Sequence, residues 1–295
     1  MYYCFVVNGR DDKAALSNLI EALIKAVQQP IQYEVYTTKF AGDATYFVRN
    51  FKAETDTCFV ACGGDGTVNE VASGMVGDPR KYLAVLAMGT GNDFVKYYPD
   101  HDFNSIQALV SGNPTKLDIM KIGDRYSINV TNFGFDSIVG SIGAKLSAKG
   151  VKNPFRWGIA VALLKGRYNK IKVFANGEQL NYNGKLLLCT VSNGHYVGGE
   201  FYCAPKAKNN DGLKDVCLIK TMSLFRFLSL LPTYRSGQHL DSTEMEKDVE
   251  YVQTDHVEIV AQNQIELCLD GEMLAGKEFA IDILSKAVNF IIPGF

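Results

Sequence analysis

Two glycine-containing runs hold the residues of this chain that could handle a phosphate group. The first, residues 63–67 (Gly-Gly-Asp-Gly-Thr), follows the apolar stretch 59–62 and precedes a helical pattern. Glycines at a strand end let the chain turn and bring bare amides against a ligand, and a helix N-terminus adds partial positive charge. The run is not a Walker A loop, since no Gly-Lys-Ser/Thr follows it, and it is not the six-residue dinucleotide fingerprint. A plain strand-to-helix connection is the alternative interpretation.

The second run, Gly89-Thr90-Gly91-Asn92-Asp93-Phe94, follows another buried strand pattern at 83–87. Because the carboxyl ends of neighbouring parallel strands meet at one edge of a sheet, the two runs are expected to share a crevice. Each brings an aspartate, Asp65 and Asp93, and carboxylate oxygens are ligands that Mg²⁺ prefers.

With these runs the chain resembles the diacylglycerol kinase catalytic-domain family of lipid kinases, which also includes sphingosine kinases. Two later segments match the family's motifs: Ala204-Pro205-Lys206-Ala207 through Asp211-Gly212-Leu213, and Asp270-Gly271-Glu272. The four motifs stand in the family's order, so the resemblance covers most of the chain. The compact length is similar to that of the bacterial members.

Residues 1–122 alternate between strand and helix patterns. Strands are expected at 1–7, 33–37, 57–62 and 83–87, and helices at 16–27, at 44–51 and directly after the first glycine run. This alternation predicts a doubly wound α/β nucleotide-binding domain with its crevice at the carboxyl ends of the strands.

From residue 117 on, short strand patterns follow one another with turn signals such as Asn176-Gly177. They include 171–175, 185–192, 257–261 and 264–269, and they predict a mainly antiparallel β-sandwich over 123–286. Helices are expected near 137–168 and 223–237. The resemblance suggests that 287–295 returns to the first domain, in a lipid kinase/NAD kinase-like plan with a cleft between the domains as the default site.

The resemblance implies ATP as the phosphate donor, with Mg²⁺. Backbone amides at 64–67 are expected to hold the phosphates, supported by Thr90, while Asp65 and Asp93 hold the metal. Thr38 either contacts the nucleotide or caps a turn. The expected nucleotide-binding residues are Asn8, Thr38, Gly63, Gly64, Asp65, Gly66, Thr67, Asn69, Glu70, Gly89, Thr90 and Asn92.

Glu272 is, by the resemblance, the proton acceptor for the lipid hydroxyl, and Asp65 is the second catalytic candidate. Glu272 follows a glycine in a turn after the strand pattern 265–269, a position that would expose a base. Without the other motifs, an ordinary hairpin turn would explain this residue.

A structural Mg²⁺ site is implied at Asp211, with the backbone carbonyls of Lys208 and Leu213. The alternative is turn chemistry without function, since residues 209–212 (Asn-Asn-Asp-Gly) favour a turn. The first loop departs from the family: relatives carry Asn-Pro and then Ser-Gly, where this chain has Asn8-Gly9-Arg10. That loss weakens the expected phosphate clamp.

The composition narrows the classes of protein to which this chain could belong. A chain of 295 residues is long enough for two domains, and a net charge of −2 gives no general attraction to nucleic acid. The sequence contains no run of about 18 apolar residues, the length that a membrane-spanning helix needs. The N-terminal residues are expected to form a buried strand and not a leader peptide. The seven cysteines lack metal-ligand spacing and are expected to be reduced core residues of a cytoplasmic protein.

Together with these features, the resemblance implies an ATP-dependent lipid kinase, cytoplasmic and peripheral at the inner membrane face, with diacylglycerol as the first candidate acceptor and phosphatidic acid as the product. Two alternatives stay open: NAD kinase-like phosphorylation of a soluble substrate, and a catalytically weak nucleotide- or lipid-binding relative. The second glycine run and Asp270-Gly271-Glu272 favour the lipid branch. The sequence is also compatible with a homodimer.

The segment 140–172 has eight basic residues and no acidic one, and the aromatic residues Phe155 and Trp157 lie among them. Basic helices with aromatic residues suit anionic headgroups, so peripheral membrane contact is expected here. A solvated helix face is the alternative. The residues are Lys145, Lys149, Lys152, Phe155, Arg156, Trp157, Lys165, Arg167, Lys170 and Lys172.

Neutralising Lys145, Lys149, Lys152 and Arg156 together should weaken binding to anionic vesicles and flatten its salt dependence, because fewer charges face the headgroups. Vesicle co-sedimentation across a salt series measures this. Equal binding by wild type and variant would leave the segment as a solvated surface.

Overall fold

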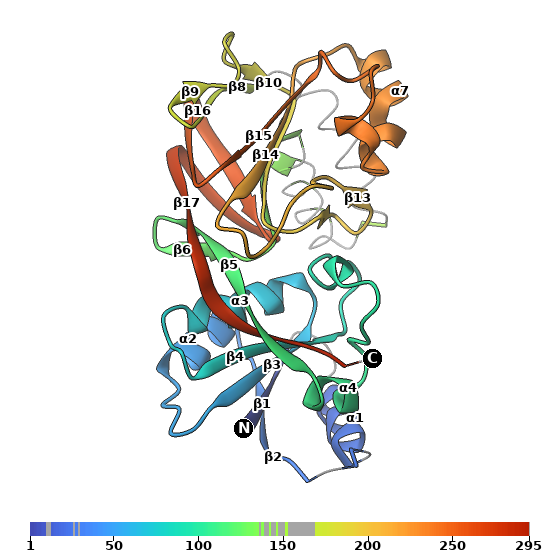
Figure 1. The fold of residues 1–295 in the computed structure, drawn as a ribbon, viewed down its shortest axis with the longest axis vertical. Helices are drawn as coiled ribbons and strands as arrows, with labels where there is room; N and C mark the ends of the chain where they lie inside the picture. Colours follow the sequence, from blue (N-terminus) through green and yellow to red (C-terminus); the bar gives the residue numbers. More distant parts are fainter. Residues whose placement is uncertain are drawn as a thin grey trace. The chain divides into compact units, whose positions relative to one another are not determined.

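The computed structural model divides the chain into two compact units (Figure 1). The first comprises Met1–Ile119 and Leu284–Phe295, and the second Met120–Ile283. The described residues are 1–9, 13–25, 27–28, 30–135, 137–138, 142, 146, 151–152 and 169–294. The chain passes from the first unit to the second after Ile119 and returns to the first unit after Ile283. The sequence patterns predict these boundaries after residues 122 and 286.

The first unit is built on a parallel sheet. Its strands are β1 (Tyr2–Val7), β2 (Gln32–Thr37), β3 (Thr57–Gly63), β4 (Lys81–Ala87) and the end of β17 (Glu272–Ile292). Its helices are α1 (Lys13–Lys25), α2 (Asp43–Asn50), α3 (Asp65–Met75), α4 (Ile106–Val110) and the 3-10 turn η1 (Val95–Tyr97). The strand order is β17-β4-β3-β1-β2, and each neighbouring pair is parallel. This is the doubly wound arrangement that the sequence predicts.

β3 lies in the middle of this sheet and is buried along its whole length. Strands of a parallel sheet covered on both faces have continuous apolar sequences, as residues 58–62 have. Around β3 the core of the unit includes Phe5, Ile20 and Leu86. The apolar run therefore positions Gly63, its last residue, at the carboxyl edge of the sheet.

The second unit is mainly antiparallel. Its strands are β6 (Arg125–Ser127), β7 (Val130–Gly134), β8 (Asn169–Ala175), β9 (Glu178–Gln179), β10 (Lys185–Leu186), β11 (Leu188–Ser192), β12 (Tyr196–Val197), β13 (Phe201–Tyr202), β14 (Lys214–Ile219), β15 (Val249–Thr254) and β16 (His256–Leu269). β5 (Asn113–Ile122) and β17 each contribute to both units, and the helices are α7 (Leu224–Arg235) and η2 (Gln238–Leu240).

The sheet of the second unit is apolar on both faces. Along β7, β11 and β14, alternate residues point to opposite sides. Phe133, Val191 and Val216 belong to one core cluster, which we call the sandwich core. The residues between them, such as Val130 and Cys217, belong to a second cluster with Phe227 and Leu230 of α7, which we call the helix-side core. The predicted β-sandwich is therefore present, with a helix packed on its second face.

Two strand predictions were wrong in detail. Residues 185–192 form two strands, β10 and β11, which are separated at Leu187. The backbone of Leu187 still bonds to neighbouring segments, since its carbonyl accepts from Phe135 N and its N–H donates to Ile219 O, both at 2.9 Å. Residues 257–261 and 264–269 form one strand, β16, whose register with β17 shifts between Val260 and Ile265. The helix predicted near 137–168 lies almost entirely outside the described residues, and the one near 223–237 is α7.

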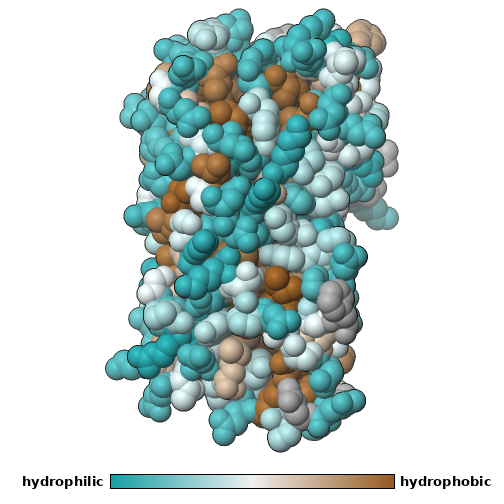
Figure 2. Space-filling model, in the orientation of Figure 1, coloured by the Kyte–Doolittle hydropathy of each residue, from teal (hydrophilic) through white to brown (hydrophobic). Residues whose placement is uncertain are grey.

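All seven cysteines are without a disulfide; six are buried and Cys268 is partly buried. Burial raises the pKa of the Cys4, Cys58 and Cys62 thiols, so these side chains act as small apolar groups. In the face of the molecule drawn in Figure 2, hydrophilic side chains surround separate apolar patches. No helix in the described ranges is long and apolar enough to cross a bilayer.

Gly74 lies where α3 packs on α2. A Cβ on Gly74 would lie 2.7 Å from Val48 Cβ and 2.8 Å from Thr45 O. Gly74→Ala should therefore destabilise the protein by about 1–3 kcal/mol through overpacking, despite the gain in helix propensity. Urea denaturation measures the change.

Gly66 in the same helix is the matched control, because a Cβ there would meet nothing within 4 Å. Gly66→Ala should leave stability unchanged or raise it by up to about 1 kcal/mol. Equal destabilisation by both variants would contradict the packing argument.

Candidate active site

The turn from β3 into α3 forms the corner expected to bind phosphate. Thr67 N and Val68 N donate to Gly64 O at 3.0 and 3.1 Å, which starts the helix. Residue 63 must be glycine, because a Cβ there would lie 2.4 Å from Thr67 Oγ1. The first amides of an α-helix generally have no partner within the helix, and at the start of α3 the amides that precede Thr67 N are the ones that suit an anion.

The two glycine runs touch backbone to backbone. A Cβ on Gly89 would lie only 2.4 Å from Gly64 Cα. β3 and β4 stay paired to their ends, where Gly63 is opposite Ala87, and Met88 N donates to Gly63 O at 3.0 Å. The structure thus brings the two sequence motifs together at one edge of the sheet, as the strand pattern implies.

Asn92 shapes the second loop. It has a left-handed backbone (φ 52°), which asparagine tolerates better than most residues. Its Oδ1 accepts from Gly89 N at 3.0 Å, and its Nδ2 donates to Gly89 O at 2.9 Å. The side chain predicted to bind nucleotide is thus engaged in holding the loop, while Thr90 beside it is exposed.

Asp65 and Asp93 face each other across Gly91. The position of a Cβ on Gly91 would lie 3.0 Å from Asp65 Oδ2 and 3.7 Å from Asp93 Oδ2. Asp65 Oδ1 accepts from Phe94 N at 3.0 Å, and Asp93 Oδ1 pairs with Lys96 Nζ at 2.7 Å. Each carboxylate therefore keeps one oxygen on the side of Gly91.

Burial raises the pKa of Asp65, and the charge of Asp93 raises it further, while the Phe94 amide opposes the shift. A cation between the two carboxylates would reduce both the cost of burying the Asp65 charge and its repulsion from Asp93. An all-oxygen donor pair fits Mg²⁺, which keeps several waters when bound by one or two carboxylates. In the part of the chain that the structure describes, no group of three or more His, Cys, Asp or Glu side chains converges on a metal position.

Other predicted nucleotide residues make structural contacts. Thr38 Oγ1 accepts from Gly9 N at 3.0 Å, so it holds the first loop. Glu70 Oε2 accepts from Ala44 N at 3.2 Å, which joins α3 to the start of α2. Asn69 is buried in α3, and Asn8 N donates to Cys62 O at 3.2 Å.

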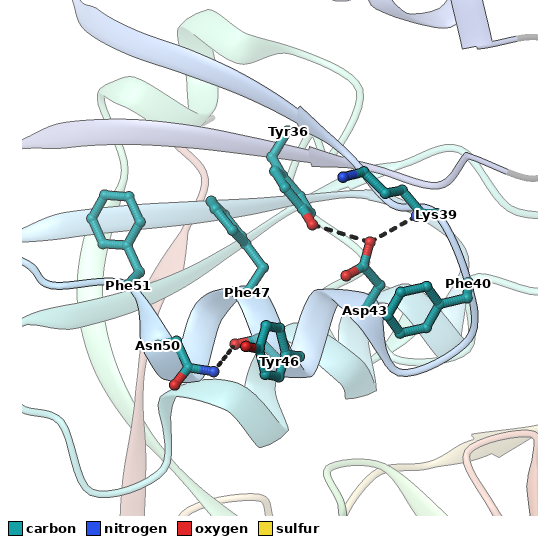
Figure 3. A pocket seen from close by; sticks show the side chains of 8 residues that line it. All are labelled: Tyr36, Lys39, Phe40, Asp43, Tyr46, Phe47, Asn50 and Phe51. Atoms are coloured by element: carbon teal, nitrogen blue, oxygen red, sulfur yellow. Dashed lines mark hydrogen bonds between the residues drawn. The ribbon is translucent and has the colours of Figure 1, made fainter.

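A pocket of about 490 Å³ lies between β2 and α2 (Figure 3). Tyr36 and Phe47 stack in it with ring centroids 3.7 Å apart, and Asp43 Oδ2 accepts from Tyr36 Oη and Lys39 N. Its lining is Tyr36, Lys39, Phe40, Asp43, Tyr46, Phe47, Asn50 and Phe51. None of these was predicted as a site residue, so this pocket is not the glycine corner.

In the second unit, Asp270 holds the turn that presents Glu272. Its Oδ2 accepts from Ser127 Oγ, Ile128 N and Asn129 N at 2.9, 2.7 and 3.1 Å, and its Oδ1 from Val130 N at 2.8 Å. Burial raises the pKa of Asp270 to about 6, against the effect of these donors. The sequence does not reveal this role of Asp270, although an Asp-Gly pair between two strands is a hairpin signal.

The hairpin itself is tight. Asp270 and Gly271 both have positive φ (48° and 95°), as a type I′ turn requires, and Leu269 pairs with Glu272 across it. Glu272 Oε2 lies 3.2 Å from Arg125 Nη1, and both side chains are more than one-third exposed. Such an ion pair contributes little to stability, so the carboxylate can exchange partners.

Asp211 lies in a turn of the second unit. Its Oδ1 accepts from Leu213 N at 3.0 Å, and Gly212 has φ 80°. This is the turn chemistry that the residue types predict, and the cation site with Lys208 stays a prediction. Of the basic residues in 140–172, Lys145, Lys149, Arg156, Lys165 and Arg167 lie outside the described residues.

The comparisons follow the division into two units. The sequence model "Diacylglycerol kinase catalytic domain" matches residues 3–122, and "YegS C-terminal NAD kinase beta sandwich-like domain" matches residues 129–292. Proteins called "Probable lipid kinase YegS-like" from Yersinia pestis (strain Pestoides F) and Yersinia pseudotuberculosis serotype O:1b (strain IP 31758) are each 30% identical to this chain, over 98% of it and 96% of the relative. The chain belongs to the diacylglycerol kinase catalytic-domain family of lipid kinases.

Solved structures agree with this lipid kinase fold. A diacylglycerol kinase from Bacillus anthracis str. Sterne superposes with a TM-score of 0.69 at 21% identity, covering 99% of this chain and 96% of that one. An NAD kinase from Archaeoglobus fulgidus, solved in complex with ATP, superposes with a TM-score of 0.53 at 12% identity, covering 99% and 94%. At these identities the likeness concerns the fold alone.

Asp270→Asn should destabilise the protein by about 2–4 kcal/mol, because an amide offers one oxygen where four donors converge and leaves buried amides unpaired. Chemical denaturation measures the loss. Asp124→Asn, an exposed aspartate just before the same segment, is the control and should change nothing. Equal stability of the two variants would mean that the Asp270 bonds do not hold the turn.

Proposed function

We propose that this lipid kinase family member transfers the γ-phosphate of ATP to the hydroxyl of a lipid, with diacylglycerol as the first acceptor to test. The observation that carries the proposal is the backbone contact of Gly64 with Gly89, which turns Asp65 and Asp93 toward one point beside the start of α3. Phosphoryl transfer needs positioned amides, a cation and a proton acceptor.

The first unit supplies the phosphate-binding groups. Amides at Gly64 to Thr67 would hold the phosphates of ATP, with the partial positive charge of α3 behind them. Asp65 and Asp93 would hold Mg²⁺, which neutralises charge on the phosphate oxygens when bound. Lys96, paired with Asp93 at 2.7 Å, keeps that carboxylate turned toward the loop.

Glu272 of the second unit would accept the proton of the acceptor hydroxyl. As that oxygen bonds to the γ-phosphorus, the bond from phosphorus to the ADP oxygen breaks and the proton passes to the Glu272 carboxylate. Arg125 is its resting partner, and the Asp270 network fixes the turn beneath it. We further propose that the protein acts at the cytoplasmic face of the membrane and contacts the membrane through residues 140–172.

Radiolabelled ATP with a total lipid extract tests the function, with NAD as a soluble acceptor in a parallel reaction. We expect a labelled lipid, identified by mass spectrometry, and none from Asp65→Asn, whose melting temperature should barely move. Label in NAD alone would overturn the proposal in favour of the NAD kinase-like alternative. Label in neither would overturn both enzymatic assignments.

Glu272→Gln should lower kcat by about 10²–10⁴-fold, because a base acts on the acceptor only in the transition state. ATP affinity measured by calorimetry with Mg²⁺ should change only a few-fold. Glu278→Gln, an exposed glutamate further along β17, is the matched control and should keep wild-type kcat. Near-normal kcat in Glu272→Gln would leave the turn structural and make Asp65 the candidate base.

A further inference from the structure

Arg125 and Glu272 stand at matching places in two hairpins of the second unit. Arg125 is the first residue after the two-residue turn 123–124 and pairs with Ile122 across it. Glu272 is the first residue after the turn 270–271 and pairs with Leu269 across it. In antiparallel pairs such residues point to the same side of the sheet, and Ile122 and Leu269 both belong to the sandwich core. The two charged side chains therefore leave the backbone on the side of one shared core.

The carboxylate of Asp270 ties these two hairpins together. Asp270 lies two residues before Glu272, and its Oδ2 accepts from Ser127 Oγ at 2.9 Å and from Ile128 N at 2.7 Å, directly after β6 begins with Arg125. The backbones that carry the two charged side chains are thus fixed to each other, although the residues are 147 positions apart in the sequence. Only rotation of the side chains then decides where the Glu272 carboxylate lies.

The two side chains meet in an ion pair. Arg125 Nη1 lies 3.2 Å from Glu272 Oε2, and 56% and 37% of the side chains are exposed. Exposed pairs contribute little to stability and cost the rotational freedom of two long side chains, so stability gives little reason for this pair. A general base, however, must lie within hydrogen-bond reach of the proton that it takes. A planar guanidinium can hold a carboxylate in one orientation through its fork of N–H donors.

We infer that Arg125 is a positioning residue, which orients the Glu272 carboxylate toward the acceptor hydroxyl. This rests on the proposed function, in which Glu272 accepts the proton of that hydroxyl. A strong ion pair would hinder the transfer, because a nearby cation favours the charged carboxylate. Water screens an exposed pair, so the carboxylate keeps its orientation and can still accept a proton. After the transfer, the charge of Arg125 is left to the water that already surrounds more than half of its side chain.

The competing explanation is an ordinary surface ion pair without a part in the reaction. Arg235 and Glu200 provide the control, because they form a second exposed arginine–glutamate pair in the same unit. Arg235 Nη2 lies 2.7 Å from Glu200 Oε2, closer than the atoms of the first pair, and both side chains are more than half exposed. Neither residue was predicted as a site residue.

The test compares four variants of the full chain with wild type: Arg125→Gln, Arg125→Lys, Glu272→Gln and the control Arg235→Gln. The acceptor is the lipid that wild type labels in the total extract, with dioctanoylglycerol tried first. Arg125→Gln should lower kcat roughly tenfold, because the base is present but less often in place. The KM for ATP and the melting temperature should match wild type. Arg125→Lys should recover part of kcat, since it keeps the charge without the planar fork. Arg235→Gln should match wild type throughout.

The double variant Arg125→Gln/Glu272→Gln separates positioning from a direct role. If Arg125 acts only through Glu272, removing both should lower kcat no further than Glu272→Gln alone. Losses that multiply in the double variant, or an equal loss in Arg235→Gln, would overturn the inference. A labelled lipid with equal kcat in wild type and Arg125→Gln would overturn the inference alone, whereas a wild type that labels no lipid would remove the proposed function and the inference with it.

Discussion

The close approach of two backbones, at Gly64 and Gly89, is the constraint on which the first unit's site depends. With a Cβ on Gly89 only 2.4 Å from Gly64 Cα, no side chain fits between the loops. Gly91, in the same loop as Gly89, lies between the Asp65 and Asp93 carboxylates, since a Cβ on it would be 3.0 Å from Asp65 Oδ2 and 3.7 Å from Asp93 Oδ2. Two negative charges are thereby kept close in a largely buried place, which raises the pKa of Asp65. Such an arrangement is unfavourable without a nearby positive charge, and Lys96 Nζ, 2.7 Å from Asp93 Oδ1, supplies one.

The second unit is organised by a buried charge. Asp270 gathers three backbone amides and a hydroxyl, so the segment 127–130 and the β16–β17 hairpin are held as one piece. Asn132 Oδ1 and Thr190 Oγ1, on the neighbouring strands β7 and β11, are the opposite case, because these oxygens are buried and have no partner among the described residues. Each such atom costs about 1–3 kcal/mol if nothing pairs with it.

Much of the fold could be predicted because its signals are local. The apolar run of β3, its terminal glycines and the start of α3 follow one another directly in the sequence, and parallel topology then implies that both glycine runs share an edge. The role of Asp270 could not be predicted, because its partners lie about 140 residues away. The same holds for Asn132 and Thr190, which become neighbours only through strand register. Leu187 has the apolar character of a strand residue, and only the structure shows that the strand is divided at this residue.

The cysteine pattern has a practical consequence for experiments. Six of the seven thiols are buried, and thiol reactivity requires access and ionisation. Cys268 is partly accessible, and it lies opposite Asn132 and four positions before Glu272. A thiol-reactive fluorophore or spin label on the unmodified chain would therefore concentrate at one place, the hairpin that presents Glu272, the proposed proton acceptor. The sequence thus carries its own attachment point for spectroscopy, four positions before that residue.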